Sequence, residues 1–300
     1  MKKEPAHFSR YDCLPNAVTD APLIPGCLVL AGGGWRGLYT QGVLDAMMEA
    51  DINMQTVIGV SAGSMSSLAY ASGQIGMSAR INLKYRPDPR YCGIGSIKEE
   101  HGMTGFRYFF KEIIPACGYA WDRIRPERRV VAVASNCDTG LPEYFEYGHC
   151  NFEKAVAASA TVPYVSRPVV IKGVPYLDGG CTDRIPYEWA LKEGYKKIIV
   201  VRTRDRSYRK EKKSGRLANA LLYGSRPAFR KALDESAEKY NACLTRLDQD
   251  EADGRIFVQA PAEPVQVGRF EKDLEKLGSL YETGYREMKE RIPELKAYLA

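Results

Sequence analysis

Residues 27–63 have the sequence CLVLAGGGWRGLYTQGVLDAMMEADINMQTVIGVSAG, and this stretch decides the fold class. Residues 27–31 are apolar without polar alternation, which is typical of a strand buried on both faces. Apolar side chains then recur at helical spacing over residues 38–50, and residues 56–60 form a second buried run. A strand, a helix and a strand in this order predict a parallel pair joined by a right-handed crossover.

The rest of the chain extends this unit. Small residues dominate 62–71, which favours a helix packed closely on a sheet. Residues 130–134 and 197–201 are further buried-strand candidates, and residues 168–177 predict a hairpin that turns at Lys172-Gly173. Helical patterns cover 217–247 and 270–299, on either side of a strand-like stretch at 255–258 and a Pro-rich loop at 260–265. We therefore expect an α/β fold with a mainly parallel central sheet.

Two segments differ from this core in composition. Residues 80–129 are rich in Gly, Pro, aromatic and charged residues, and we interpret them as a cap inserted over one face of the core. Its aromatic side chains have two interpretations, as core residues or as a cover for an acyl chain. Residues 202–216 carry eight Lys and Arg against two acidic residues, and we interpret them as an exposed, mobile connection. This stretch is either a solvated loop or a surface for anionic headgroups.

Length and composition limit the classes of protein. A chain of 300 residues with 45% hydrophobic and 27% charged residues is typical of one enzyme-sized globule and not of a disordered or coiled-coil chain. The net charge of +6 is too small to require nucleic acid as a partner. Eight scattered cysteines without a C-x-x-C pair indicate reduced structural thiols and no zinc site. No signal-peptide pattern follows Met1, and residues 52–79 are too polar to span a bilayer, so we expect a cytoplasmic protein.

A candidate nucleophile follows the second strand. Gly59-Val60-Ser61-Ala62-Gly63 matches the nucleophile-elbow pattern G-x-S-x-G, with a buried strand before it and a small-residue helix after it. The sharp turn needs residues without bulk on both sides of Ser61, because the hydroxyl must stand clear of the sheet. The alternative interpretation is a plain small-residue turn at the end of a strand.

The base that would activate Ser61 is not a histidine in the usual order. The chain has only His7, His101 and His149, whereas an ordinary α/β-hydrolase places its histidine last in the chain. A carboxylate within hydrogen-bond reach can act instead. Asp178 is the leading candidate, since it ends a predicted strand and precedes Gly179-Gly180; Asp138 in a turn and Asp183 before a helix compete with it. From spacing alone, Asp178 is explained equally well as a turn aspartate and as the base.

A glycine loop follows the first strand. In Gly32-Gly33-Gly34-Trp35-Arg36-Gly37, consecutive glycines before a helix leave backbone N–H groups free for an anion, either a phosphate or a developing oxyanion. The loop also satisfies G-x-G-x-x-G through Gly32, Gly34 and Gly37, so a dinucleotide site is an alternative. That site needs an acid at the end of the second strand, but Asp51 precedes the strand and Ser61 ends it.

Together these motifs resemble the patatin-like phospholipases. Three motifs are similar, in the same order, to those of that family: the glycine loop at 32–37, the elbow at 59–63 and Asp178-Gly179-Gly180. The stretch AASATVP at residues 157–163 is also similar to that family. The resemblance covers residues 27–204. It implies a three-layer α/β/α fold and a Ser–Asp acyl hydrolase, with residues 27–204 as the catalytic core, the cap insertion at 80–129 included, and residues 205–300 as a mainly helical extension of the same domain.

The resemblance also assigns roles to residues. It implies Ser61 as nucleophile and Asp178 as its base, with Gly59 and Gly63 forming the elbow. The glycine loop would supply the oxyanion hole through Gly32, Gly33, Gly34, Arg36 and Gly37, and Gly33 and Gly34 are the first candidates. Arg36 would either stabilise the oxyanion or brace the loop.

The expected activity is hydrolysis of a carboxylic ester of a lipid through an acyl-enzyme, without metal or cofactor, because no Asp-rich calcium loop is present. The expected partners are a lipid or another acyl ester and an anionic membrane met at the periphery, not nucleic acid, and the sequence carries no signal for the oligomeric state. Two alternatives stay open: a nucleotide-binding oxidoreductase that uses the glycine loop, and a lipid-associated module without turnover.

Overall fold

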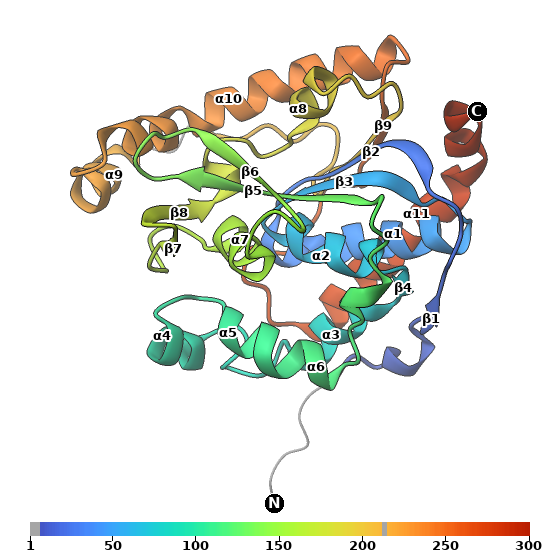
Figure 1. Ribbon diagram of the computed structural model, residues 1–300, viewed down its shortest axis with the longest axis horizontal. Helices are drawn as coiled ribbons and strands as arrows, with labels where there is room; N and C mark the ends of the chain where they lie inside the picture. The colour runs from blue at the N-terminus through green and yellow to red at the C-terminus, as the bar shows by residue number, and fades with distance from the viewer. Residues whose placement is uncertain (1–6, 212–214) are drawn as a thin grey trace, which may run out of the picture.

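A mixed β-sheet forms the centre of the molecule, and helices cover both of its faces (Figure 1). The computed structural model describes residues 7–211 and 215–300, and within them the main sheet has eight strands. The strand order is β10-β9-β2-β3-β5-β8-β7, and β6 also pairs with β5. The strands are β2 (Ile24–Leu30), β3 (Met54–Val60), β5 (Arg129–Asn136), β6 (Pro142–Glu146), β7 (Val169–Ile171), β8 (Val174–Asp178), β9 (Ile198–Val201) and β10 (Phe257–Gln259).

Five neighbouring strands of the sheet, from β10 to β5, are parallel, whereas β6, β7 and β8 form antiparallel pairs. Leu30 at the end of β2 is in register with Gly59 of β3 on one side and with Val201 of β9 on the other. The chain proceeds from β2 through β3 to β5 and later returns to β9 on the opposite side of β2. Ligand sites of open parallel sheets lie at the carboxyl ends of strands where the strand order reverses in this way.

Alternate side chains of the strands serve two different cores. Leu28 and Leu30 of β2 belong to a cluster with α1, α2, α7 and α11, while Cys27 and Val29 belong to a cluster with α8 and α10. The alternation explains the uninterrupted apolar runs, because a strand covered on both faces needs no polar side. The expected three-layer α/β/α arrangement is thus confirmed. These helices are α1 (Gly37–Glu49), α2 (Ala62–Ala71), α7 (Phe152–Ala160), α8 (Tyr187–Lys192), α10 (Pro227–Ala252) and α11 (Leu274–Leu299).

The C-terminal helix α11 packs tightly on α1. A Cβ atom on Gly42 would lie 2.1 Å from the carbonyl oxygen of Tyr281, and one on Gly284 would lie 2.2 Å from that of Tyr39. Only glycine permits so close an approach of two helix backbones. The last helix of the chain therefore forms part of the same layer as the first helix after the glycine loop.

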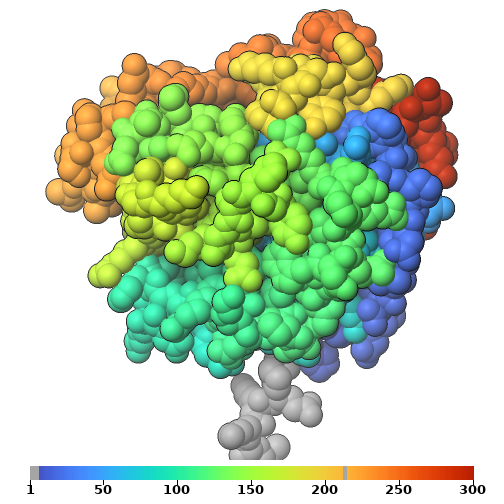
Figure 2. All heavy atoms as spheres, in the orientation of Figure 1, coloured from blue at the N-terminus to red at the C-terminus, as the bar shows by residue number. Residues whose placement is uncertain are grey.

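The segment expected as a cap consists of short helices below the α1–α2 layer (Figure 1). Its aromatic side chains join the large core cluster, and Tyr91, Phe109 and Phe110 are buried. Figure 2 shows this segment, coloured teal to green, packed directly against the rest of the molecule. Its elements are α3 (Met77–Tyr85), α4 (Ile94–Glu100), α5 (Phe106–Tyr108), a π-helical turn (Phe109–Ile113), α6 (Ile114–Ala116) and a 3₁₀ turn (Trp121–Arg123). A small two-stranded antiparallel sheet of β1 (Ala17–Val18) and β4 (Gln74–Ile75) lies beside it.

The basic stretch was expected as an exposed, mobile connection; Arg206, Arg209 and Arg216 are exposed as expected, but for Arg202 the expectation is wrong. Arg202 is buried with 1% of its surface exposed, and its guanidinium donates to the carbonyl oxygen of Asp205 at 2.8 Å. Arg206 and Arg209 form ion pairs with Glu251 and Asp248 of α10. Composition alone did not indicate these partners, which lie about 40 residues later in the sequence. Lys212 and Lys213, like the start at Met1, lie outside the described residues.

Two further elements differ from the expectation. β6 was not predicted, because its residues are only half-buried and carry Glu143 and Glu146, so it lacks the apolar run that marks the inner strands. The helix expected over 217–247 is two helices, α9 (Arg216–Tyr223) and α10, separated at Gly224 and restarted by Pro227 at the first helical position.

Candidate active site

Ser61 occupies a strained turn between β3 and α2. Its backbone has φ 56° and ψ −121°, a conformation that L-residues rarely adopt. A Cβ atom on Gly63 would lie 2.4 Å from the carbonyl oxygen of Leu30, and one on Gly59 would lie 2.5 Å from the carbonyl carbon of Gly63. Both positions therefore require glycine, for steric reasons. The Ser61 N–H donates to Oγ of Ser159 on α7 at 2.9 Å, which supports the turn from a separate helix.

Asp178 lies within hydrogen-bond distance of Ser61, although 117 positions separate the two in sequence. The Ser61 hydroxyl donates to Oδ2 of Asp178 at 3.0 Å. The other carboxylate oxygen, Oδ1, accepts the N–H of Gly180 at 2.8 Å, and the Asp178 N–H donates to the carbonyl oxygen of Thr161 at 2.8 Å. The carboxylate is thus fixed on one side by its own loop and presents its second oxygen to the serine.

The two competing aspartates lie in other surroundings. Asp138 forms an ion pair with Arg226 in the turn after β5. Asp183 accepts the hydroxyl hydrogen of Tyr144 at 2.9 Å, and burial raises the pKa of its carboxyl to about 6. The Ser61 hydroxyl bonds to neither of them, since its one hydrogen is directed at Asp178.

The glycine loop between β2 and α1 lies against the serine. A Cβ atom on Gly32 would lie 3.3 Å from Cβ of Ser61, and one on Gly37 would lie 2.9 Å from Cβ of Ala62. The N–H of Gly32 donates to the carbonyl oxygen of Arg184, and that of Gly37 donates to carbonyl oxygens inside the loop. Within the described ranges, the N–H groups of Gly33, Gly34 and Ala62 have no hydrogen-bond partner.

The loop is held by tight contacts behind it. A Cβ atom on Gly33 would lie 2.6 Å from Oγ1 of Thr203, whose hydroxyl donates to the carbonyl oxygen of Gly32 at 3.0 Å. Gly34 has φ +58°, and a Cβ atom there would lie 2.7 Å from the carbonyl oxygen of Arg269. Larger residues at these positions would displace the loop from the serine.

Arg36 is buried beneath the segment that precedes α11. Its Nη1 donates to the carbonyl oxygen of Val267 at 3.4 Å, and its Nε has no partner in the part of the chain that the structure describes. Burial lowers the pKa of Arg36 to about 10, and the nearby charges of Arg204 and Arg269 act in the same direction. The guanidinium therefore contacts the C-terminal segment.

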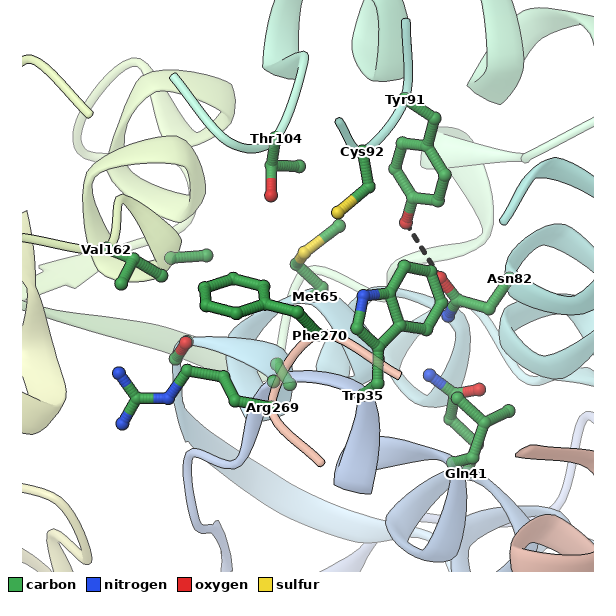
Figure 3. A pocket seen from close by; sticks show the side chains of 15 residues that line it. Trp35, Gln41, Met65, Asn82, Tyr91, Cys92, Thr104, Val162, Arg269 and Phe270 are labelled. Carbon is green, nitrogen blue, oxygen red and sulfur yellow. Dashed lines mark hydrogen bonds between the residues drawn. The ribbon is translucent and has the colours of Figure 1, made fainter. Parts of the chain in front are cut away.

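A pocket opens in front of Ser61, and its wall is mainly apolar (Figure 3). Figure 3 shows the Phe270 ring between Val162 and Trp35, with Met65 beside it. The Trp35 indole meets the Tyr91 ring edge-on, with ring centroids 6.0 Å apart. Other wall residues include Leu38, Gln41, Asn82, Cys92, Thr104 and Arg269. An apolar cavity with a nucleophile in its wall suits an acyl chain whose carbonyl carbon reaches the serine.

Most of this wall was not predicted from the sequence. Trp35 lies inside the glycine loop and Met65 lies one helical turn after Ser61, so both carried a local signal. Arg269 and Phe270 carried none, because they lie beyond the stretch that resembles a known family and follow a segment interpreted as a Pro-rich loop. They reach the pocket only through tertiary packing.

Residues 7–211 and 215–300 contain neither a candidate metal centre nor a candidate membrane-spanning helix. No group of three or more His, Cys, Asp or Glu side chains there is arranged to hold a metal ion. None of the helices in these ranges has the length and apolar character that crossing a membrane demands.

Comparison with family models gives two matches. The model of the patatin-like phospholipases matches residues 28–191, and the model of a domain of unknown function (DUF6363) matches residues 226–300. The first match contains the glycine loop, the elbow and Asp178. The second contains Arg269 and Phe270 of the pocket wall.

Similar proteins occur in bacteria and viruses. The uncharacterized protein YjjU of Escherichia coli K12 is 28% identical over 190 residues, which cover 61% of this chain and 53% of YjjU, so the match spans about half of that protein. The probable lipid hydrolase 463L of Invertebrate iridescent virus 6 is 26% identical over 211 residues, which cover 61% of this chain and 71% of that protein. The crystal structure of VipD from Legionella pneumophila has a TM-score of 0.48 and 13% identity, covering 99% of this chain and 72% of VipD.

Proposed function

The chain belongs to the patatin-like phospholipase family, and from this premise we propose that it hydrolyses carboxylic esters of lipids with Ser61 as nucleophile and Asp178 as base. The observation that carries the proposal is the 3.0 Å hydrogen bond to Asp178 from the hydroxyl of Ser61, which lines an apolar pocket. A serine hydroxyl needs a base within this distance to become an effective nucleophile.

The first half of the reaction forms an acyl-enzyme. Ser61 Oγ attacks the ester carbonyl carbon while its proton passes to Oδ2 of Asp178. The negative charge on the carbonyl oxygen is stabilised by the free N–H groups of Gly33, Gly34 and Ala62. The bond to the alcohol then breaks, and the alcohol leaves with the proton from Asp178.

The second half releases the acid. Water attacks the acyl-enzyme, Asp178 accepts its proton, and the same N–H groups stabilise the second tetrahedral intermediate. The bond between the acyl carbon and Ser61 Oγ breaks, the proton returns to the serine, and the carboxylic acid leaves.

Labelling with a fluorophosphonate probe, together with turnover of a short p-nitrophenyl ester, tests the proposal. We expect wild-type protein to be labelled and to hydrolyse the ester, and Ser61→Ala to lose both properties. Ser279→Ala is the matched control, because Ser279 is exposed on α11 and the chemical change is the same. A panel of lipid classes with the same two variants would then identify the ester. Wild-type turnover by Ser61→Ala would contradict the assignment of the nucleophile.

A further inference from the structure

Helix α9 presents leucines to solvent. Leu217 and Leu221, one helical turn apart, are 84% and 82% exposed, and Leu222 is 54% exposed. The opposite side of the helix is attached to the protein: the Tyr164 hydroxyl donates to Oδ1 of Asn219 at 2.5 Å, and the Tyr164 N–H donates to the Tyr223 hydroxyl at 2.9 Å. The helix is therefore anchored by its polar side and exposes its apolar side. Exposed apolar residues grouped in this way mark interaction surfaces.

The helix that carries the exposed leucines is anchored close to the wall of the Ser61 pocket. Tyr164, which anchors α9, follows Val162 of the pocket wall closely in sequence. Tyr164 and Val165 are 49% and 36% exposed, and Phe270, also in the wall, is 40% exposed. We call these residues the α9 surface; it comprises Tyr164, Val165, Leu217, Leu221, Leu222 and Phe270. In Figure 1 α9 lies at one end of the molecule, far from β1, and Figure 2 shows it projecting there.

Basic side chains accompany the α9 surface. Arg216 on α9, Arg230 on α10 and Arg269 beside Phe270 form no ion pair with a described carboxylate. Other arginines of the C-terminal third of the chain form ion pairs: Arg206 pairs with Glu251, and Arg246 pairs with Glu188. Asp234 of α10 contacts α9, where it accepts a hydrogen bond from the side-chain amide of Asn219 at 2.6 Å, and a neutral amide does not cancel its charge. Arg216, Arg230 and Arg269 outnumber this one carboxylate, so the charge of the set is net positive.

We propose that the α9 surface docks on an anionic lipid surface, with the leucines inserted among the acyl chains and Arg216, Arg230 and Arg269 at the headgroups. This arrangement would bring the mouth of the Ser61 pocket to the lipid, so its purpose rests on the proposed function. Apolar side chains next to basic ones are the combination that interfacial helices use on anionic membranes. A second copy of this chain fits less well, because an eight-residue helix offers far less than the roughly 800 Å² per partner of a stable dimer.

Vesicle binding by the Ser61→Ala protein tests the proposal without turnover. Co-sedimentation should show binding to phosphatidylcholine vesicles that contain roughly 30 mol% phosphatidylglycerol, weaker binding to pure phosphatidylcholine, and weakening by added salt. The double substitution Leu217→Ser and Leu221→Ser should reduce partitioning on the order of 100-fold, about tenfold for each leucine. Val18→Ser is the matched control, because Val18 is 57% exposed on β1 at the other end of the molecule, and it should bind like its parent.

Turnover of a soluble ester distinguishes an effect on lipid docking from an effect on the hydrolysis reaction. In a background with Ser61 intact, the double leucine variant should hydrolyse a monomeric p-nitrophenyl ester within about twofold of wild type, since neither leucine lines the pocket. Hydrolysis without vesicle binding, or equal binding by the double variant, would overturn the docking surface and leave the proposed function standing. Vesicle binding without ester hydrolysis or probe labelling would overturn the function and leave the docking surface standing. A dimer that the leucine substitutions dissociate, with no binding to vesicles, would also overturn the docking proposal.

Discussion

The N–H of Trp35 donates to the carbonyl oxygen of Arg269 at 3.3 Å, and this contact joins the glycine loop to the segment before the last helix. The same carbonyl oxygen lies 2.7 Å from the position of a Cβ atom on Gly34. The region that matches a domain of unknown function therefore contributes directly to the wall and the backing of the pocket. Its removal would expose the loop from behind.

This contact makes Gly34 a sensitive position. Gly34→Ala places a methyl group against the Arg269 carbonyl and at φ +58°, so the loop must shift away from Ser61. If the Gly34 amide stabilises the oxyanion, we expect kcat for a p-nitrophenyl ester to fall about 100-fold or more. Probe labelling of Ser61 should slow in parallel, because the same amide stabilises the negative oxygen on phosphorus.

Gly268→Ala is the control for this substitution. It lies in the same C-terminal segment, and a Cβ atom there would meet nothing within 4 Å. Its kcat and melting temperature should remain close to those of wild type. An equal loss in both variants would indicate that the segment, and not the amide of the loop, limits the reaction.

Replacing the base should reduce turnover without unfolding the protein. Asp178→Asn keeps an oxygen that can accept the Gly180 N–H, but an amide does not accept the serine proton. We expect kcat to fall on the order of 10²–10⁴-fold with little change in the melting temperature. Turnover and thermal unfolding measured on the same preparation check this.

Asp138→Asn is the matched carboxyl-to-amide control. Asp138 forms a surface ion pair with Arg226, and such pairs contribute little to stability. Activity should stay at the wild-type level. If Asp138→Asn impaired turnover as strongly as Asp178→Asn, the assignment of Asp178 as the base would be wrong.

Stability should fall as the pH rises from about 4 to 7, mainly because of Asp45 and to a smaller extent because of Asp183, whose pKa burial raises to about 6. Burial raises the pKa of the Asp45 carboxyl from 3.8 to about 7, although the Gly76 N–H and the Tyr281 hydroxyl donate to it. Between these two values the folded state binds a proton that the unfolded state has lost, so the free energy of unfolding decreases with pH and levels off above 7. The expected decrease is about 2–4 kcal/mol.

Urea unfolding at pH 5 and pH 8 measures this decrease. Asp45→Asn should remove most of the difference between the two pH values, because an amide has no charge to bury. Asp51→Asn on the exposed turn after α1 is the control and should retain the pH dependence of wild type. An undiminished decrease in Asp45→Asn would assign the effect to other groups.

The sequence indicated the architecture because its signals are local. The apolar runs at residues 27–31 and 56–60 have no polar alternation, and only a strand covered on both faces needs none. The turn at Lys172-Gly173 was predicted from the flanking strand patterns, and both residues have positive φ. β6 was missed since a half-buried strand at the side of a sheet has no such run.

The basic stretch shows where composition fails. Eight cations within fifteen residues predicted a solvated segment, yet Arg202 is buried and its neighbours pair with acids of α10. The sequence shows charges but not their partners. Whether a charged residue is exposed depends on which distant residues fold next to it.

The sequence by itself determined that a serine elbow, a glycine loop and an aspartate would lie at strand ends of one α/β sheet. It could do so because backbone sterics and apolar periodicity act over only a few residues. Only the tertiary structure decided that Asp178, and neither Asp138 nor Asp183, lies 3.0 Å from Ser61, and that Arg269 and Phe270 complete the pocket. The physical reason is range: a hydrogen bond or a van der Waals contact depends on position to within a fraction of an ångström, and the packing of the whole chain sets that position.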